Sequence, residues 1–144
     1  MSLKIGKWFY RAINDDATVH AFTSGRIYPV ARNMEQDAED AIPYVIIAPE
    51  TFSEVELSKD YVGDTYHDEV TVSVLACCVS YDDLVDLATA IRDAVDTYFQ
   101  TVEYDGTWDF TVDDYTFAAD APQLDPTKPC FYQTLRFRCE TSPR

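Results

Sequence analysis

Residues 69–99 read EVTVSVLACCVSYDDLVDLATAIRDAVDTYF, and in this stretch a strand pattern changes directly into a helix pattern. In the first part, valines alternate with Thr71 and Ser73, and this period of two in β-branched residues is typical of a strand. Toward Leu75, Cys77 and Val79 the strand becomes apolar on both sides. Because apolar residues on both sides suit a central position better than an edge, we expect this strand to lie in the middle of a sheet.

The second part of the stretch has the spacing of an amphipathic helix. Ser80 is a suitable N-cap, because its hydroxyl can accept a hydrogen bond from an amide of the first turn, and Asp82 and Asp83 suit the positive end of the helix dipole. The apolar side of the helix consists of Leu84, Leu87, Ala88, Ile91, Val95 and Tyr98. This side must be buried, so we predict that the helix lies across a sheet.

The other elements follow from the same two periods. An amphipathic helix is predicted over residues 3–13, opened by Ser2. The run Asn14-Asp15-Asp16 ends it and can also cap a short helical turn at residues 19–22. Strands are predicted at residues 26–30, 44–48 (covered on both faces), 108–112 with a continuation past a bend to 117, and 131–140; residues 31–41 and 120–129 are predicted loops, and residues 50–68 a projecting hairpin or arm. The result is one α+β domain over residues 1–144, with an antiparallel or mixed sheet of four to five strands and two helices packed on one face.

The charge of the chain excludes several classes of partner. It has 26 acidic and 11 basic residues and a formal net charge of -15, which keeps nucleic acids and anionic membranes at a distance. No apolar run reaches the roughly 18–20 residues that span a bilayer, and the N-terminus has no uninterrupted signal-peptide core. We therefore expect a soluble protein that is made in the cytoplasm.

The four cysteines are Cys77, Cys78, Cys130 and Cys139. They form no CxxC pair, and Cys77 and Cys78 would point to opposite faces of a strand, so they cannot chelate one metal ion there. The expectation is four reduced cysteines in the core, because free cysteine behaves as a small buried hydrophobe.

The best candidate for a chemical site is the run from Asp64 to Glu69, DTYHDE, in which His67 lies among carboxylates. Such a cluster can bind a divalent metal or raise the pKa of the histidine. Its spacing matches no metal-binding loop, however, and a chain so rich in acids places some beside a histidine by chance, so a solvated loop is the favoured interpretation. We predict no catalytic, cofactor-binding or metal-binding residues, with a metal-dependent enzyme that uses this run as the less favoured alternative.

Tyrosines and arginines at predicted sheet positions are candidates for an interface between subunits. Tyrosine is as typical of half-buried sheet positions as of interfaces, and the two interpretations have equal weight here. Arginines on the solvated face of the last strand can pair with carboxylates of the same subunit or of another one, and Arg26 has the same ambiguity. The candidate interface residues are Arg26, Tyr28, Tyr61, Tyr66, Arg136 and Arg138.

Two motifs in the first half of the chain resemble a known family. GRIYP at residues 25–29, followed after a variable loop by PYVI at residues 43–46, is similar to the tail-completion proteins of long-tailed bacteriophages, which resemble tail terminators in fold. The order of elements agrees over nearly the whole chain, including a closing strand, FYQTLRFR, at residues 131–138. The acidic insertion at residues 31–41 and the polar arm at residues 53–68 depart from the family pattern.

The resemblance implies a structural subunit and not an enzyme. Proteins of this family cap the tail tube as a ring, commonly of six subunits, and mediate joining to the head; they have no known catalytic residues and no cofactor. It also implies tail-tube and head-connector proteins as partners, and DNA that passes through the ring without specific binding. It implies no membrane association. The implied location is the host bacterial cytoplasm during assembly and then the virion tail. A small acidic host binding or regulatory module of similar fold stays open as an alternative.

Overall fold

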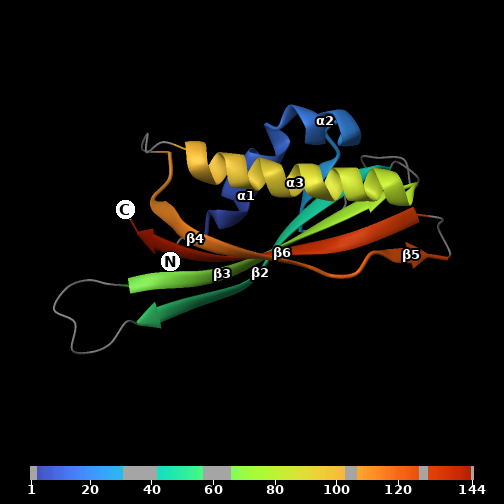
Figure 1. The fold of residues 1–144 in the computed structure, drawn as a ribbon. Helices are drawn as coiled ribbons and strands as arrows, with labels where there is room; N and C mark the ends of the chain where they lie inside the picture. Colours follow the sequence, from blue (N-terminus) through green and yellow to red (C-terminus); the bar gives the residue numbers. More distant parts are fainter. Residues whose placement is uncertain (1–2, 31–41, 57–65, 103–106, 127–129, 144) are drawn as a thin grey trace.

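The computed structural model describes residues 3–30, 42–56, 66–102, 107–126 and 130–143, and its elements form a sheet with helices on one side (Figure 1). The elements are, in chain order, α1 (Ile5–Asn14), α2 (Ala17–Thr23), β1 (Ile27–Pro29), β2 (Tyr44–Glu56), β3 (Tyr66–Cys78), α3 (Tyr81–Thr101), β4 (Phe110–Ala119), β5 (Gln123–Asp125) and β6 (Cys130–Pro143). The fold is therefore α+β with a mixed sheet, as the sequence predicts.

The strands of the sheet are ordered β1-β2-β3-β6-β4, and β5 also pairs with β6. Only β1 and β2 are parallel; the other neighbouring strands are antiparallel. The strand predicted from residues 69–99 is β3, and it has a neighbour on each side, so its central position is confirmed. The chain continues directly from β3 into α3, where the side chain of Ser80 accepts a hydrogen bond from the amide of Asp83 at 3.2 Å, as an N-cap.

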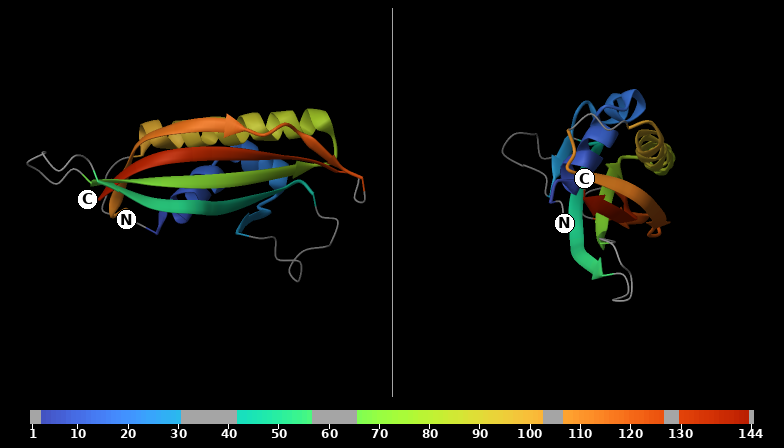
Figure 2. Two further views of the ribbon diagram at one scale, coloured as in Figure 1. Left: turned by 90° about the horizontal axis from the view of Figure 1, so that it is seen from below. Right: turned by 90° about the vertical axis from the view of Figure 1, so that its left-hand side faces the viewer.

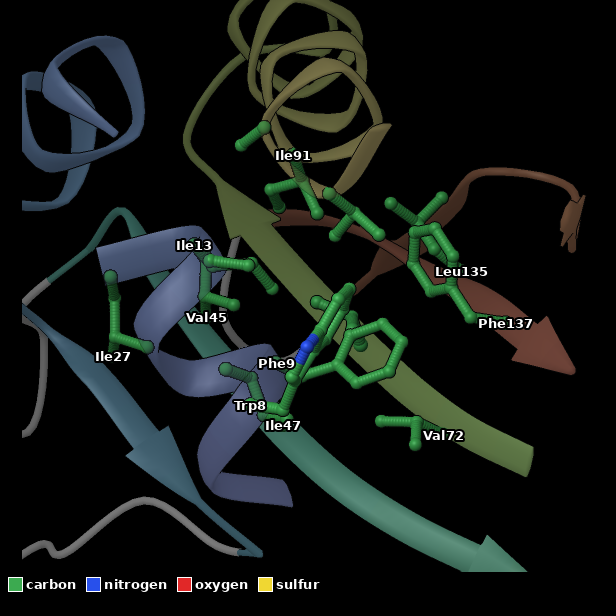
Figure 3. Packing of buried hydrophobic residues seen from close by; sticks show 14 of the residues in the cluster. Trp8, Phe9, Ile13, Ile27, Val45, Ile47, Val72, Ile91, Leu135 and Phe137 are labelled. Atoms are coloured by element: carbon green, nitrogen blue, oxygen red, sulfur yellow. The ribbon is translucent and has the colours of Figure 1, made fainter. Parts of the chain in front are cut away.

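All three helices lie on the same face of the sheet (Figure 2). α1 contacts β1 and β2, whereas α3 contacts β3 and β6, and the two helices contact each other. The core lies between them and the sheet (Figure 3), where Phe9 of α1, Ile91 of α3 and Phe137 of β6 are completely buried. The apolar side predicted for α3 is confirmed, because Leu84, Leu87, Ile91 and Val95 are each 0% exposed.

The helix count differs from the prediction, because residues 17–23 form a third helix rather than a single turn. Asp16 caps it and accepts a hydrogen bond from the amide of Val19 at 3.0 Å. Ser24 and Gly25, both with positive φ, end it, and Gly25 adopts this conformation readily because it has no Cβ. α1 begins at Ile5 with Lys4 at the N-cap and no side-chain cap bond; the predicted cap, Ser2, lies outside the described residues.

The strand count also differs: the described residues form six strands, where four to five are predicted. The additional strand is β5, three residues within a segment predicted as a loop because of its prolines, and it forms by pairing with the beginning of β6. Strands β2 and β3 are also longer than predicted, at 13 residues each, so residues 50–56 and 66–68 of the predicted arm belong to a long antiparallel hairpin. The remainder of that arm, residues 57–65, lies outside the described residues.

Candidate functional site: the open face of the sheet

The helices leave the second face of the sheet uncovered along its described strands (Figure 2). Side chains alternate between the faces of a strand, so the neighbours of the core residues point to this open face. In β6, Leu135 and Phe137 are buried under the helices, whereas Arg136 and Arg138 point the other way. The prediction of one buried and one solvated face for this strand is therefore correct.

Arg136 joins carboxylates from two sides of the sheet. Its Nη1 lies 2.5 Å from Oδ1 of Asp120, just past β4, and its Nε lies 3.8 Å from Oε2 of Glu50 in β2. Glu50 reaches this position because the register of β2 and β3 shifts between Pro49 and Thr51, a β-bulge that inserts one extra residue. The hydrogen bond to Asp120 raises the pKa of the Arg136 guanidinium.

Arg138 makes a similar pair at the other end of the open face. Its Nη2 donates a hydrogen bond of 2.7 Å to Oε2 of Glu69, in the neighbouring strand β3. Glu140 and Asp114 lie in the same row of the sheet as Glu69, and these three acidic residues line one pocket together with Arg138. Both arginines of β6 are therefore paired within the subunit, which was one of the two alternatives.

Of the four other candidate interface residues, the structure describes the side chains of Arg26 and Tyr28, which make separate contacts. Arg26 donates from Nε to the carbonyl oxygen of Pro43 at 3.0 Å, a bond that ties the chain before β1 to the chain before β2. Tyr28 lies half-buried in β1, at the side of Ile46. Tyr61 lies outside the described residues, and Tyr66 begins β3 but its side chain is not described.

The part of the open face near the beginning of α3 is apolar and was not predicted as a site. Tyr44, Cys77 and Tyr132 form one row across β2, β3 and β6, and Ile46 and Leu75 lie side by side in the next row. Tyr44, Ile46, Leu75 and Tyr132 are half-buried, so the prediction that residues 44–48 are covered on both faces is wrong. The sequence could have indicated this apolar surface, because Tyr44 and Ile46 alternate with Val45 and Ile47, which are buried. Only one of two alternating sets of side chains can face the helices.

The cysteines are buried packing residues. All four are free and buried, as predicted. Burial raises the pKa of the Cys77 thiol to about 12, assisted by a hydrogen bond with Cys130, and burial also raises the pKa of Cys78 and of Cys139 to about 12. Since the thiolate is the reactive form, these thiols are suited to the core and not to covalent chemistry.

The run from Asp64 to Glu69 is only partly described. Asp64 and Thr65 lie outside the described residues, Asp68 is 3% exposed in β3, and Glu69 pairs with Arg138. Among the described residues, no group of three or more His, Cys, Asp or Glu side chains is arranged to hold a metal ion. In the same part of the chain, no helix is long and apolar enough to cross a membrane.

The chain is similar in fold to a protein in a solved virion structure. It matches a chain of a solved structure described as the virion of a native gene transfer agent (GTA) particle, with a TM-score of 0.64 and 18% sequence identity. The match covers 95% of this chain and 93% of the other. No protein-family model matches the sequence, and a comparison with curated proteins found no match. At this identity the likeness shows that the two chains share a fold.

Proposed function

We propose that this protein is a structural subunit of a phage, a prophage or a related particle, that it caps the tail tube as a ring of about six copies, and that it mediates the joining of head and tail. The single observation that supports this best is the match in fold to a chain of a gene transfer agent virion over nearly the full length of both chains. The resemblance of GRIYP and PYVI to tail-completion proteins supports the tail position.

The open face of the sheet supports a role in contact rather than in chemistry. Its charged part is an alternation of carboxylates with Arg136 and Arg138, and its other part exposes tyrosine and aliphatic carbon. Polar groups around apolar contact area are typical of protein interfaces. Tail-tube and head-connector proteins are the proposed partners of such a surface.

The charge of -15 suits a ring through which DNA moves. Phosphates are repelled by a surface of like charge, so DNA in the lumen would not bind to the wall. The proposed locations are the host bacterial cytoplasm during assembly and the virion tail afterwards.

The ring is tested by light scattering coupled to size exclusion at 0.15 M salt. A ring of six 16.4 kDa chains has a mass of about 98 kDa, and electron microscopy should show a central opening. A chain that stays monomeric at millimolar concentration and at every salt concentration would contradict the ring. Joining is tested in cells that produce the particle: without this chain, heads and tails should be present but separate, and normal joined particles would contradict the role.

A further inference from the structure

The outer side of α1 carries a basic stripe in an otherwise acidic protein. Lys4, Lys7 and Arg11 are spaced by three and four residues, which places them on one side of the helix, and all three are exposed. The side turned toward the sheet carries Phe9 and Ile13, which are both completely buried. We define Lys4, Lys7 and Arg11 as the basic stripe.

The basic stripe lies along a groove and is only partly neutralised by its own subunit. The groove has a volume of about 430 Å³, and Tyr10, Asp15 and Trp108 also line it. Lys4 lies 3.6 Å from Asp109, and the guanidinium of Arg11 lies 5.0 Å from the centre of the Trp108 ring. Within the described chain Lys7 has no ion pair, although acids outnumber bases by more than two to one. An anionic partner would therefore gain contacts here that the subunit does not supply.

A second groove with the opposite charge lies between α2 and α3. It has a volume of about 410 Å³ and is lined by Asp16 of the α2 cap and by Asp86 and Asp93 of α3. Within the described residues, neither Asp86 nor Asp93 has an ion pair. Between them on the same side of the helix are Thr89 and Ala90, whose small side chains leave room for a ridge of long side chains. No residue lines both grooves, so one subunit can use both at once.

The two sets of charges match in spacing as well as in sign. Lys4 and Arg11 are seven residues apart on α1, and Asp86 and Asp93 are seven residues apart on α3. Each pair thus spans about 10 Å along its helix axis, at a rise of 1.5 Å per residue. Two helices packed side by side can place both opposite-charge pairs in register, with Lys7 between them over the small residues.

We propose that the basic stripe of α1 docks into the α2–α3 groove of a second copy of this chain. The proposal rests on the homo-oligomeric ring of the proposed function and names the surfaces that build it. Because the two surfaces differ, the contact is heterologous: each subunit offers a stripe to one neighbour and a groove to the other, and such contacts close into a ring when the rotation permits. The opposite charges also orient two subunits whose net charges repel.

The test uses two charge-reversed variants of the full chain, Lys4→Glu/Lys7→Glu/Arg11→Glu and Asp86→Lys/Asp93→Lys. Either variant alone brings like charges together at the contact, so its self-association should weaken about 100-fold or more. In an equimolar mixture the reversed stripe of the first variant can dock into the reversed groove of the second. The original stripe of the second variant can likewise dock into the original groove of the first. The mixture should therefore assemble into rings in which the two variants alternate, as an even number of subunits allows.

The control Lys7→Arg/Arg11→Lys keeps the charge and should assemble like the unsubstituted chain. Circular dichroism verifies that each variant folds. If a reversed variant does not fold, the neutral variants Lys7→Gln/Arg11→Gln and Asp86→Asn/Asp93→Asn take the place of the reversed ones. Each of these two neutral variants, tested by itself, should weaken assembly. Variants that assemble like the unsubstituted chain, or reversed variants that fail to assemble even when mixed, would overturn this interface while leaving the ring intact. An unsubstituted chain that remains monomeric would overturn both. Binding of a short DNA duplex that Lys4→Glu/Lys7→Glu/Arg11→Glu abolishes, with assembly unchanged, would assign the stripe to nucleic acid instead.

Discussion

Phe137 is the residue whose truncation should reveal most about how the core is held together. It is 0% exposed, and its ring centre lies 5.3 Å from that of Phe9, 6.0 Å from Tyr115 and 5.2 Å from Phe117 (Figure 3 shows Phe9 and Phe137). A buried Phe→Ala change costs about 3–5 kcal/mol, and each aromatic pair contributes about 0.5–1.5 kcal/mol beyond burial. With three ring partners from α1 and β4, we expect Phe137→Ala to lose about 4–5 kcal/mol of unfolding free energy.

The loss can be measured by urea denaturation followed by circular dichroism. In a chain of this length it corresponds to a fall in Tm of roughly 10–15 °C. Thr116→Ala is the control, because Thr116 is exposed on the adjacent strand β4, and it should change the unfolding free energy by no more than about 0.5 kcal/mol. A loss below about 1.5 kcal/mol for Phe137→Ala would refute the reasoning, since it would mean that the ring cluster is not the centre of the core.

Two further predictions concern pH and salt. Burial raises the pKa of the Cys139 thiol to about 12, so from pH 9 upward the unfolded chain loses this proton while the folded chain keeps it. The free energy of unfolding should therefore fall as pH rises from 9 to 12, by about 4 kcal/mol for this group. In urea titrations at pH 8 and pH 10.5, Cys139→Ala should lose less stability with pH than the unsubstituted chain, and equal losses would contradict the shift. Ring assembly, followed by light scattering, should strengthen from 0.01 M to 0.15 M salt. Over this range the Debye length falls from about 30 Å to about 8 Å, so salt screens the repulsion between subunits of charge -15. Assembly should weaken again near 1 M salt, because direct ion pairs are then screened too. Assembly that is strongest at the lowest salt concentration would show that ion pairs outweigh the repulsion throughout.

The parts of the fold that local pattern decides could be predicted from the sequence. The strand and helix of residues 69–99, the cap at Ser80 and the buried side of α3 depend on neighbours within a few positions, and all are found in the structure. The two faces of β6 follow from its alternation for the same reason. Strand β5 has no such signal, because three residues become a strand only through the partner that they meet in β6.

The candidate site could be predicted only in part, because its contacts join distant segments. The sequence indicates that Arg136 faces away from the core, but its pairing with Glu50 depends on a bulge, and its pairing with Asp120 depends on the neighbour that β6 acquires at its edge. Likewise, the apolar part of the open face required knowledge of which face of β2 the helices cover. The basic stripe of α1 was within reach of the sequence, since Lys4, Lys7 and Arg11 are spaced by three and four residues.

The strand order has a consequence for how the chain folds during its synthesis. The centre of the sheet is the pair β3 and β6, in which Val70 lies opposite Cys139 and Cys78 lies opposite Phe131. Roughly 50 residues separate these strands, among them all of α3, so closing this pair carries the entropy of a long loop. Until β6 leaves the ribosome, β3 has an unpaired edge and the apolar side of α3 lacks part of its cover. A nascent chain interrupted before residue 130 would expose such an edge to other chains, and it is the kind of intermediate that aggregates or binds a chaperone.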